Sequence, residues 1–464
     1  MRFFKKILLL LSITIACSCN NKEDKESSTT YIRGQIVNPT LDYVIFSRGN
    51  QVLDTVKLDA SNFFEYTTEK IKAGLYSFKH SETQVFYIEP GDSLLMHVNT
   101  ADFDESLAYS GKGGEQNNLL MELYLRNETE NQNLPKWYSL STKEFESKID
   151  SLKALKLAEY KQFVQNNTVN ENFKKIALAN IDYDYYSKKE LFVSGNRSNP
   201  EKFNDAYFEY RKKIDFGLND LNFYYPYYRF MNRYFTNMAC SKYNDKTTIN
   251  RNSFQYNYQK IHLIDSTVSS DTLKNSLLRY TAISYLLNAK DAEEEKKFFD
   301  AFSKMNTDKK HLAEVSVLMH ATVKLTSGNI IPNVMLVSSE NVAKDLHTII
   351  KAPTVLYFWS SQSASQYKNI HTRATELKSK YPEYDFIGIN MDTHFKKWRQ
   401  TITKLKYNTA SEFQLDNLED AEKKLVLNSM NKVFIVDKNA IILEGKTNMF
   451  NTNFEELLLG FLNR

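Results

Sequence analysis

The fold of the C-terminal part of this chain is decided by one apolar stretch, Thr354-Val-Leu-Tyr-Phe-Trp359. A nearly continuous apolar run of this kind is typical of a strand in a sheet that is covered on both faces. The pattern after it predicts, in order, a helix over 364–380, a strand over 385–391, helices over 395–405 and 418–427, strands over 432–436 and 441–444, and a helix over 453–462. Residues 328–464 are therefore expected to form an α/β domain.

Four segments of this domain resemble TlpA-like thioredoxin-fold proteins, and the order of strands and helices is that of the thioredoxin fold. The segments are Ile331-Pro-Asn-Val-Met-Leu336, Pro353-Thr-Val-Leu-Tyr-Phe-Trp-Ser-Ser361, Phe386-Ile-Gly-Ile-Asn-Met-Asp392 and Lys432-Val-Phe-Ile-Val-Asp-Lys438. Two upstream segments, Tyr87-Ile-Glu-Pro-Gly-Asp-Ser93 and Gly111-Lys-Gly-Gly-Glu-Gln-Asn-Asn118, are similar to the β-rich domain often fused ahead of this module in lipoproteins. The resemblance implies a C-terminal thioredoxin-like fold and, for members that keep their cysteines, thiol–disulfide exchange.

The residues that this family uses for chemistry are absent here. Its reaction needs a Cys-x-x-Cys motif after the Phe-Trp strand end, where one thiolate attacks a disulfide and the second cysteine resolves the intermediate. The matching residues here are Ser363-Ala-Ser-Gln366. The family also has a cis proline before its third core strand, and Asn431 stands at that position. A cis bond before a non-proline residue costs about 2.5–4 kcal/mol, so we expect Met430–Asn431 to be trans. We predict no catalytic residue and a vestigial site at Ser363, Gln366 and Asn431.

A different chemistry for Ser363 would need a base within hydrogen-bond reach of its hydroxyl. His371 lies eight residues further along, more than two helical turns away, so hydrolysis is not expected. The only cysteines are Cys17, Cys19 and Cys240, which excludes a disulfide framework in the folded part. Cys240 is most simply a small buried residue. We predict no cofactor and no metal site.

The N-terminus has the pattern of an export signal. Arg2, Lys5 and Lys6 precede an apolar run over 7–16 that is too short to span a bilayer. A cysteine after small residues at this junction resembles the lipobox of bacterial lipoproteins. We predict a signal peptide over 1–18, lipidation of Cys19 with Cys17 as the alternative, and a polar tether over 19–29. A plain secretory signal with an incidental cysteine is the competing interpretation.

Two further regions lie between the leader and the C-terminal domain. Residues 30–115 contain short β-branched and aromatic segments separated by turns, which predicts an antiparallel β-sandwich, and Gly111-Lys-Gly-Gly114 is expected to be a loop without phosphate-binding spacing. Residues 116–327 predict an all-α region, with a capping box at Ser141-Thr-Lys-Glu144. Its tyrosine pairs could form a ligand surface, although packing between layers is favoured.

Composition excludes some classes of protein but does not identify the function. The 464 residues are 42% hydrophobic and 25% charged, which indicates globular domains rather than disorder. The net charge is +4 with both signs interspersed, so nucleic acid is not an expected partner.

The leading hypothesis is a non-enzymatic, membrane-anchored lipoprotein of the cell envelope. It would lie at the outer membrane, facing the periplasm or the cell surface, and would bind an unknown protein or peptide partner. The alternative is a TlpA-like oxidoreductase that uses non-standard residues or a partner's thiol, with Cys240 as its own candidate thiol. A third hypothesis is a carbohydrate- or peptide-binding accessory protein.

Overall fold

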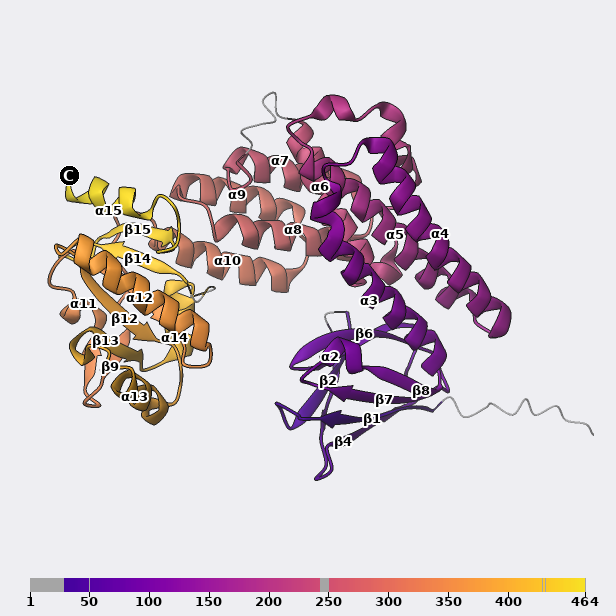
Figure 1. The fold of residues 1–464 in the computed structure, drawn as a ribbon, viewed down its shortest axis with the longest axis horizontal. Helices are drawn as coiled ribbons and strands as arrows, with labels where there is room; N and C mark the ends of the chain where they lie inside the picture. The colour runs from indigo at the N-terminus through magenta and orange to yellow at the C-terminus, as the bar shows by residue number, and fades with distance from the viewer. Residues whose placement is uncertain (1–28, 50, 243–249, 428, 430, 464) are drawn as a thin grey trace, which may run out of the picture. The chain divides into compact units, whose positions relative to one another are not determined.

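The computed structural model describes residues 29–463 except 50, 243–249, 428 and 430. The predicted leader, with Cys17 and Cys19, and Met430 lie outside the described residues. The chain forms two compact units (Figure 1). One extends to Lys213 and includes Asp220–Arg233, and the other comprises Ile214–Asn219 and the chain from Tyr234 onward. Both units contain helices. The domain boundaries predicted near residues 115 and 328 remain predictions, which limited proteolysis can test.

The first unit begins with two four-stranded sheets, ordered β4-β1-β7-β8 and β3-β2-β5-β6. Alternating apolar residues from both sheets, among them Ile32, Phe46 and Phe78, pack into one core. The strands are β1 (Thr30–Val37), β2 (Tyr43–Arg48), β3 (Gln51–Lys57), β4 (Phe63–Thr68), β5 (Gly74–His80), β6 (Glu82–Ile88), β7 (Ser93–Asn99) and β8 (Ala108–Lys112). The predicted packing of the two sheets as a sandwich remains a prediction. The predicted antiparallel pairing is wrong for one pair, because β1 and β7 run parallel.

Helices complete the first unit. They are the short α2 (Phe103–Ser106), the long helices α3 (Gly114–Trp137), α4 (Thr142–Asn166) and α5 (Glu171–Gly195), and the start of α6 (Tyr225–Ser241). The 3-10 segments η1 (Pro200–Lys202) and η2 (Asp205–Lys213) belong to the same unit, and η3 (Asn219–Leu221) belongs to it except for Asn219. Helix α4 begins at the predicted capping box, where the Ser141 and Glu144 side chains bond reciprocally to the backbone. The segment Gly111-Lys-Gly-Gly114 differs from the expected loop, because it ends β8 and begins α3.

Among its described residues, the second unit contains the end of α6 and four whole helices ahead of a seven-stranded sheet. The helices are α7 (Phe254–Thr267), α8 (Asp271–Leu286), α9 (Ala292–Met305) and α10 (Lys309–Lys324). The strands are β9 (Met335–Ser338), β10 (Ala343–Asp345), β11 (Thr354–Trp359), β12 (Asp385–Asn390), β13 (Glu412–Leu415), β14 (Val433–Val436) and β15 (Ile442–Thr447), in the order β10-β9-β13-β12-β11-β14-β15. β11 is parallel to β12, and β12 is parallel to β13.

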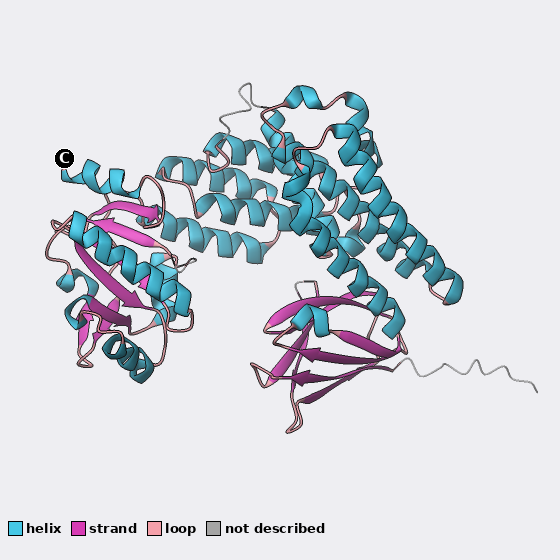
Figure 2. Ribbon diagram, viewed as in Figure 1, coloured by secondary structure: helices cyan, strands magenta, loops and turns pink. Residues whose placement is uncertain are grey.

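Helices cover both faces of this sheet (Figure 2). One face packs against α12 (Ala364–Lys380), α13 (Phe395–Lys404) and α15 (Phe454–Leu462). The other packs against α11 (Leu346–Ile349), α14 (Leu418–Leu425) and the α10 residues Leu318 and Ala321. All six residues of β11 are consequently buried, as its apolar sequence predicts.

An ion pair also joins the helices of this unit to its sheet. Lys446, on β15, lies 2.8 Å from the fully buried carboxylate of Glu295 on α9, and its ammonium also donates to the Leu286 carbonyl. Thr322 on α10 donates to the same glutamate.

Within the described residues, no helix combines the length and the apolar character needed to cross a membrane.

Candidate functional site

The predicted vestigial site lies where β11 ends and α12 begins. Ser363 is the residue before α12, and its side chain makes no capping hydrogen bond. The Gln366 Nε2 atom lies 3.3 Å from the Phe358 carbonyl oxygen and 3.4 Å from the Asn431 Oδ1 atom, so it donates long hydrogen bonds to both. The fold thus brings Gln366 and Asn431 together, next to Ser363. We call these three residues the Ser363 edge.

A buried carboxylate fixes the chain just before the Ser363 edge. Asp392 follows β12, and it accepts hydrogen bonds from the Ser360 hydroxyl at 2.5 Å and the Ser361 backbone N–H at 2.7 Å. Burial alone would raise the pKa of Asp392, but the hydrogen bonds from Ser360, Ser361 and Asn390 hold it below its usual range. Asp392 is therefore ionised at neutral pH, and it acts as an anchor for this turn.

Lys432 is the ionisable group beside Asn431. Its ammonium donates to the carbonyl oxygens of Leu425 at 2.8 Å and Val426 at 2.9 Å, at the end of α14. Burial lowers the pKa of Lys432 to about 7, and the charge of Lys446 acts in the same direction. Val426 has a φ of +50°, which is unusual for a β-branched residue. The lysine therefore stabilises a strained helix end through these two hydrogen bonds. The same burial makes its charged form less favourable than in water.

A second polar cluster, the Glu412 network, lies at the middle of the sheet. Glu412, the first residue of β13, is only 2% exposed. Its two carboxylate oxygens accept hydrogen bonds from the Tyr357 hydroxyl and the Trp359 indole N–H, each at 3.0 Å. His371, on α12, places its Nε2 atom 3.0 Å from the same carboxylate. The network thus consists of Glu412, His371, Tyr357 and Trp359.

The hydrogen bonds of His371 engage both of its ring nitrogens. Its Nδ1 atom lies 2.6 Å from the Tyr367 carbonyl oxygen, which can only accept, so Nδ1 donates this bond. Its Nε2 atom faces the Glu412 carboxylate. The His371 ring also stacks on Tyr407 with centroids 3.7 Å apart. Burial and the charge of Glu412 raise the pKa of Tyr407 to about 12 and that of Tyr357 well above 10.

This geometry limits the chemistry of the domain. Both ring nitrogens of His371 are engaged by Tyr367 and Glu412, so neither faces Ser363 as a general base. No cysteine follows Cys240 in the sequence, and therefore neither polar cluster contains a thiol. Cys240 itself is buried against Ala239 and Tyr256. The described residues of the two clusters include hydrogen-bonded polar groups, but no nucleophile with a free base beside it.

Comparison with known proteins addresses the C-terminal domain. Residues 352–442 match the model of a family described as Thioredoxin-like. This domain is thioredoxin-like. The predicted organisation of N-terminal sheets, central helices and a C-terminal thioredoxin-like domain is thereby confirmed in outline. None of the curated proteins compared with the chain matches it.

Solved structures with similarity to the chain carry related descriptions. A thioredoxin-like protein from Bacteroides caccae has a TM-score of 0.36 and 12% identity, covering 59% of this chain and 93% of its own. The thioredoxin domain of a thiol-disulfide oxidoreductase from Bacteroides vulgatus has a TM-score of 0.26 and 13% identity, covering 30% of this chain and 96% of its own. A thiol:disulfide interchange protein from Bacteroides sp. has a TM-score of 0.25 and 14% identity, covering 30% and 93%.

The sequence did not point to Glu412 or to Lys432. Glu412 begins a strand that the pattern did not predict, and its sequence neighbours give it no distinguishing feature. Gly388 was the available signal, because a glycine inside a buried strand often marks a close approach by another group. A Cβ at this position would lie 2.4 Å from the Glu412 Oε1 atom. The glycine therefore makes the space in which the buried carboxylate fits.

Proposed function

We propose that this chain is a TlpA-like lipoprotein of the cell envelope whose thioredoxin-like domain binds a partner without redox chemistry. The observation that carries the proposal is the composition of the Ser363 edge. A hydroxyl and an amide occupy the two positions at which exchange requires thiols, and the Gln366 amide is bonded to Phe358 and Asn431. Neither side chain can form a mixed disulfide.

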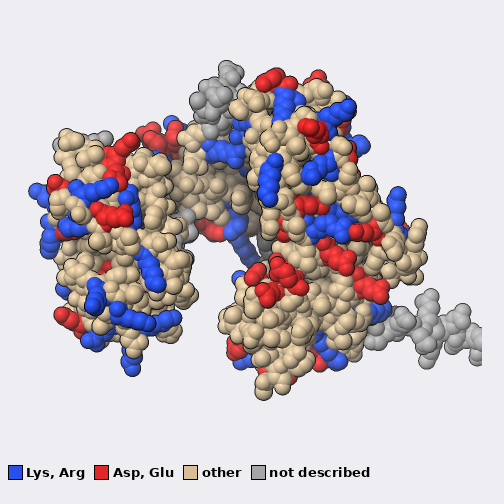
Figure 3. All heavy atoms as spheres, in the orientation of Figure 1, with Lys and Arg blue, Asp and Glu red and all other residues tan. Residues whose placement is uncertain are grey.

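The oxidoreductase alternative depends on a thiol from Cys240 or from a partner. Cys240 is 3% exposed, and reactive thiols need access as well as a lowered pKa. Its burial counts against a role as nucleophile. A membrane anchor at Cys19, or at Cys17, is part of the proposal and is supported by the leader pattern alone. Interspersed Lys, Arg, Asp and Glu on the visible face of each unit support a partner other than nucleic acid (Figure 3).

Insulin reduction by the mature protein with dithiothreitol tests the redox proposal. We expect no turnover above the reductant alone. The Ser363→Cys/Gln366→Cys variant should form a disulfide yet reduce insulin weakly, and adding Asn431→Pro should increase the rate. The Ser363→Cys single variant is the matched control, because it supplies a thiol without a resolving partner. Dithiol-dependent turnover by the unmodified protein would overturn the proposal, and Cys240→Ala would then identify the thiol.

Mass spectrometry of the membrane-extracted protein tests the anchor. An acylated N-terminal Cys19 is expected, and Cys19→Ser should release the protein into the soluble fraction. Cys17→Ser is the matched control and should leave the anchor in place. A soluble, unmodified mature chain would contradict the anchor without affecting the redox proposal.

A further inference from the structure

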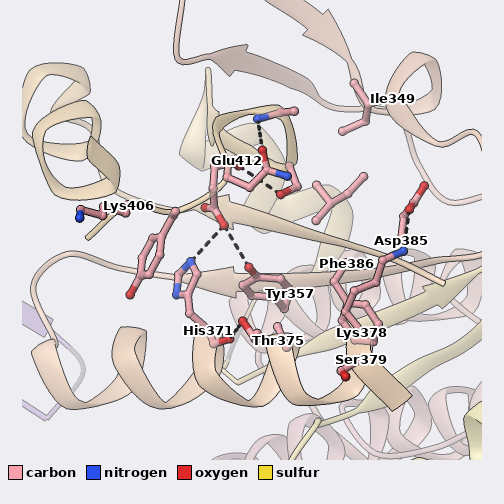
Figure 4. Close-up of a pocket in the computed structure, with 16 residues that line it drawn as sticks. Ile349, Tyr357, His371, Thr375, Lys378, Ser379, Asp385, Phe386, Lys406 and Glu412 are labelled. Atoms are coloured by element: carbon pink, nitrogen blue, oxygen red, sulfur yellow. Dashed lines mark hydrogen bonds and ion pairs between the residues drawn. The ribbon is translucent and has the colours of Figure 1, made fainter. Parts of the chain in front are cut away.

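Helix α13 carries positive charge and no negative charge. It packs against the sheet through the buried side chains of Trp398 and Ile402. Its basic residues are all exposed, and they are Lys396, Lys397, Arg399 and Lys404. Lys406 follows the helix, and Figure 4 shows its ammonium pointing away from His371 and Glu412. We call these five basic residues the α13 basic surface.

No acidic residue interrupts this part of the chain. The sequence contains neither Asp nor Glu between Asp392 and Glu412, and these two carboxylates are themselves buried and hydrogen-bonded within the protein. In the part of the chain that the structure describes, no carboxylate lies within ion-pair distance of the α13 basic surface, and its ammonium and guanidinium groups form no hydrogen bond. The surface therefore presents uncompensated positive charge to solvent.

Helix α14, which packs on the opposite face of the sheet, shows a different arrangement of charge. Its Lys423 and Lys424 each pair with an acidic residue one turn earlier, Glu419 and Asp420 respectively. Pairs at this spacing support a helix and leave it with little net charge. Helix α13 has no such pair, so its basic residues do not stabilise it by ion pairing.

Two of these lysines also lie at the end of α13 where positive charge is unfavourable. Lys396 and Lys397 belong to the first turn, and the N-terminus of a helix already carries partial positive charge. His394, the residue before the helix, makes no capping hydrogen bond with its side chain. The stability of the fold therefore does not account for the positive charge at this position.

We propose that the α13 basic surface binds the anionic head groups of a phospholipid bilayer. The inference rests on the proposed anchor, which would hold the chain at a bilayer, and it adds a second contact with that bilayer. Charge complementarity supports this partner, because an anionic bilayer is negative over an area that can meet all five basic residues at once. Each Lys or Arg close to such a surface strengthens binding by about fivefold.

The contact is electrostatic and remains at the level of the head groups. No large apolar side chain between residues 393 and 411 is exposed, so α13 offers nothing to insert into the hydrocarbon of the bilayer. Binding should therefore be sensitive to salt, since exposed charges are screened as ionic strength rises.

Vesicle co-sedimentation of the chain from residue 20 onward tests this proposal. This chain has neither Cys17 nor Cys19, so it measures binding without the anchor. We expect at least about tenfold tighter binding to vesicles of about two parts phosphatidylcholine to one part phosphatidylglycerol than to phosphatidylcholine alone, and loss of this preference in about 0.5 M NaCl. Equal binding to both vesicles, or binding that salt does not weaken, would overturn the proposal. Neither result affects the anchor, which mass spectrometry tests separately.

Variants test whether α13 is the binding surface. The Lys396→Gln/Lys397→Gln/Lys404→Gln variant should bind the anionic vesicles at least about tenfold more weakly. Its matched control, Lys423→Gln/Lys424→Gln/Lys438→Gln, removes the same charge from exposed positions outside the α13 basic surface and should change binding by less than about twofold. Circular dichroism shows whether both variants fold.

Two outcomes of this comparison would contradict the assignment. An equal loss of binding in the two triple variants would mean that net charge, and not α13, determines the interaction. Tighter binding of polyglutamate or single-stranded DNA than of the anionic vesicles, measured by fluorescence anisotropy on the same chain, would overturn the choice of lipid as the partner.

Discussion

The Ser363 edge and the Glu412 network are two polar clusters on one sheet, and they differ in burial and in charge. The Ser363 edge is neutral and partly exposed, and its amide contacts are 3.3 and 3.4 Å long. The Glu412 network is buried and contains a histidine–carboxylate pair, with contacts of 3.0 Å. The site predicted from the family motifs is thus the less constrained of the two. Four substitutions test this difference, ordered by expected effect.

Glu412→Ala should have the largest effect on stability. It leaves His371, Tyr357 and Trp359 without their common acceptor in a dry environment, and breaking a buried pair costs about 3–5 kcal/mol. Tryptophan fluorescence during urea unfolding would measure the change. The control Glu419→Ala removes an exposed i,i+4 partner of Lys423 and should leave the free energy of unfolding nearly unchanged. Equal effects of the two variants would show that the network contributes no special stability.

Gly388→Ala should come next. The new methyl group would lie 2.4 Å from the Glu412 carboxylate, and overpacking of this kind costs about 1–3 kcal/mol. Gly460→Ala is the same substitution on the exposed face of α15, with no atom within 4 Å, and should stabilise the helix by up to about 1 kcal/mol. Unfolding midpoints with opposite shifts are expected. A neutral Gly388→Ala would mean that Glu412 can move without loss.

The dependence of stability on pH should depend on Lys432. The unfolded lysine keeps its proton up to about pH 10, whereas the folded one releases it near its pKa of about 7. The unfolded state binds more protons over this interval, so the free energy of unfolding should rise as pH increases from 7 toward 10. Lys432→Met should flatten this rise, as measured by urea titrations at several pH values. Lys438→Met, at an exposed position, should retain it.

Gln366→Ala should have the smallest effect. It removes two long, partly exposed hydrogen bonds, which together contribute about 1 kcal/mol or less. Asn369→Ala on the exposed face of α12 is the comparison. A loss as large as that of Glu412→Ala would reverse the ranking of the two clusters.

The elements that the sequence predicted well are those whose own pattern determines them. The expected helix over 364–380 coincides with α12, and the apolar run at 354–359 coincides with β11. Strand β13 was missed because Glu412-Phe-Gln-Leu415 is short and places two polar residues in a buried strand. Its side chains are buried through contacts with residues far away in sequence, which no local pattern encodes. The candidate site was therefore predicted at the Ser363 edge, where family motifs exist, and missed at Glu412.

The helices that cover the sheet also affect how this domain could be moved between proteins. A segment cut at the start of the matched region, near residue 352, would leave behind Leu318 and Ala321 of α10 and the Glu295 partner of Lys446. The excised sheet would expose the apolar residues that α10 covers and would carry an uncompensated lysine, a combination that favours aggregation over folding. A transplantable cassette would therefore have to include α9 and α10. A gene fusion or duplication would also have to keep these covering helices. The segment that can fold after such a transfer is therefore larger than the thioredoxin-like part alone.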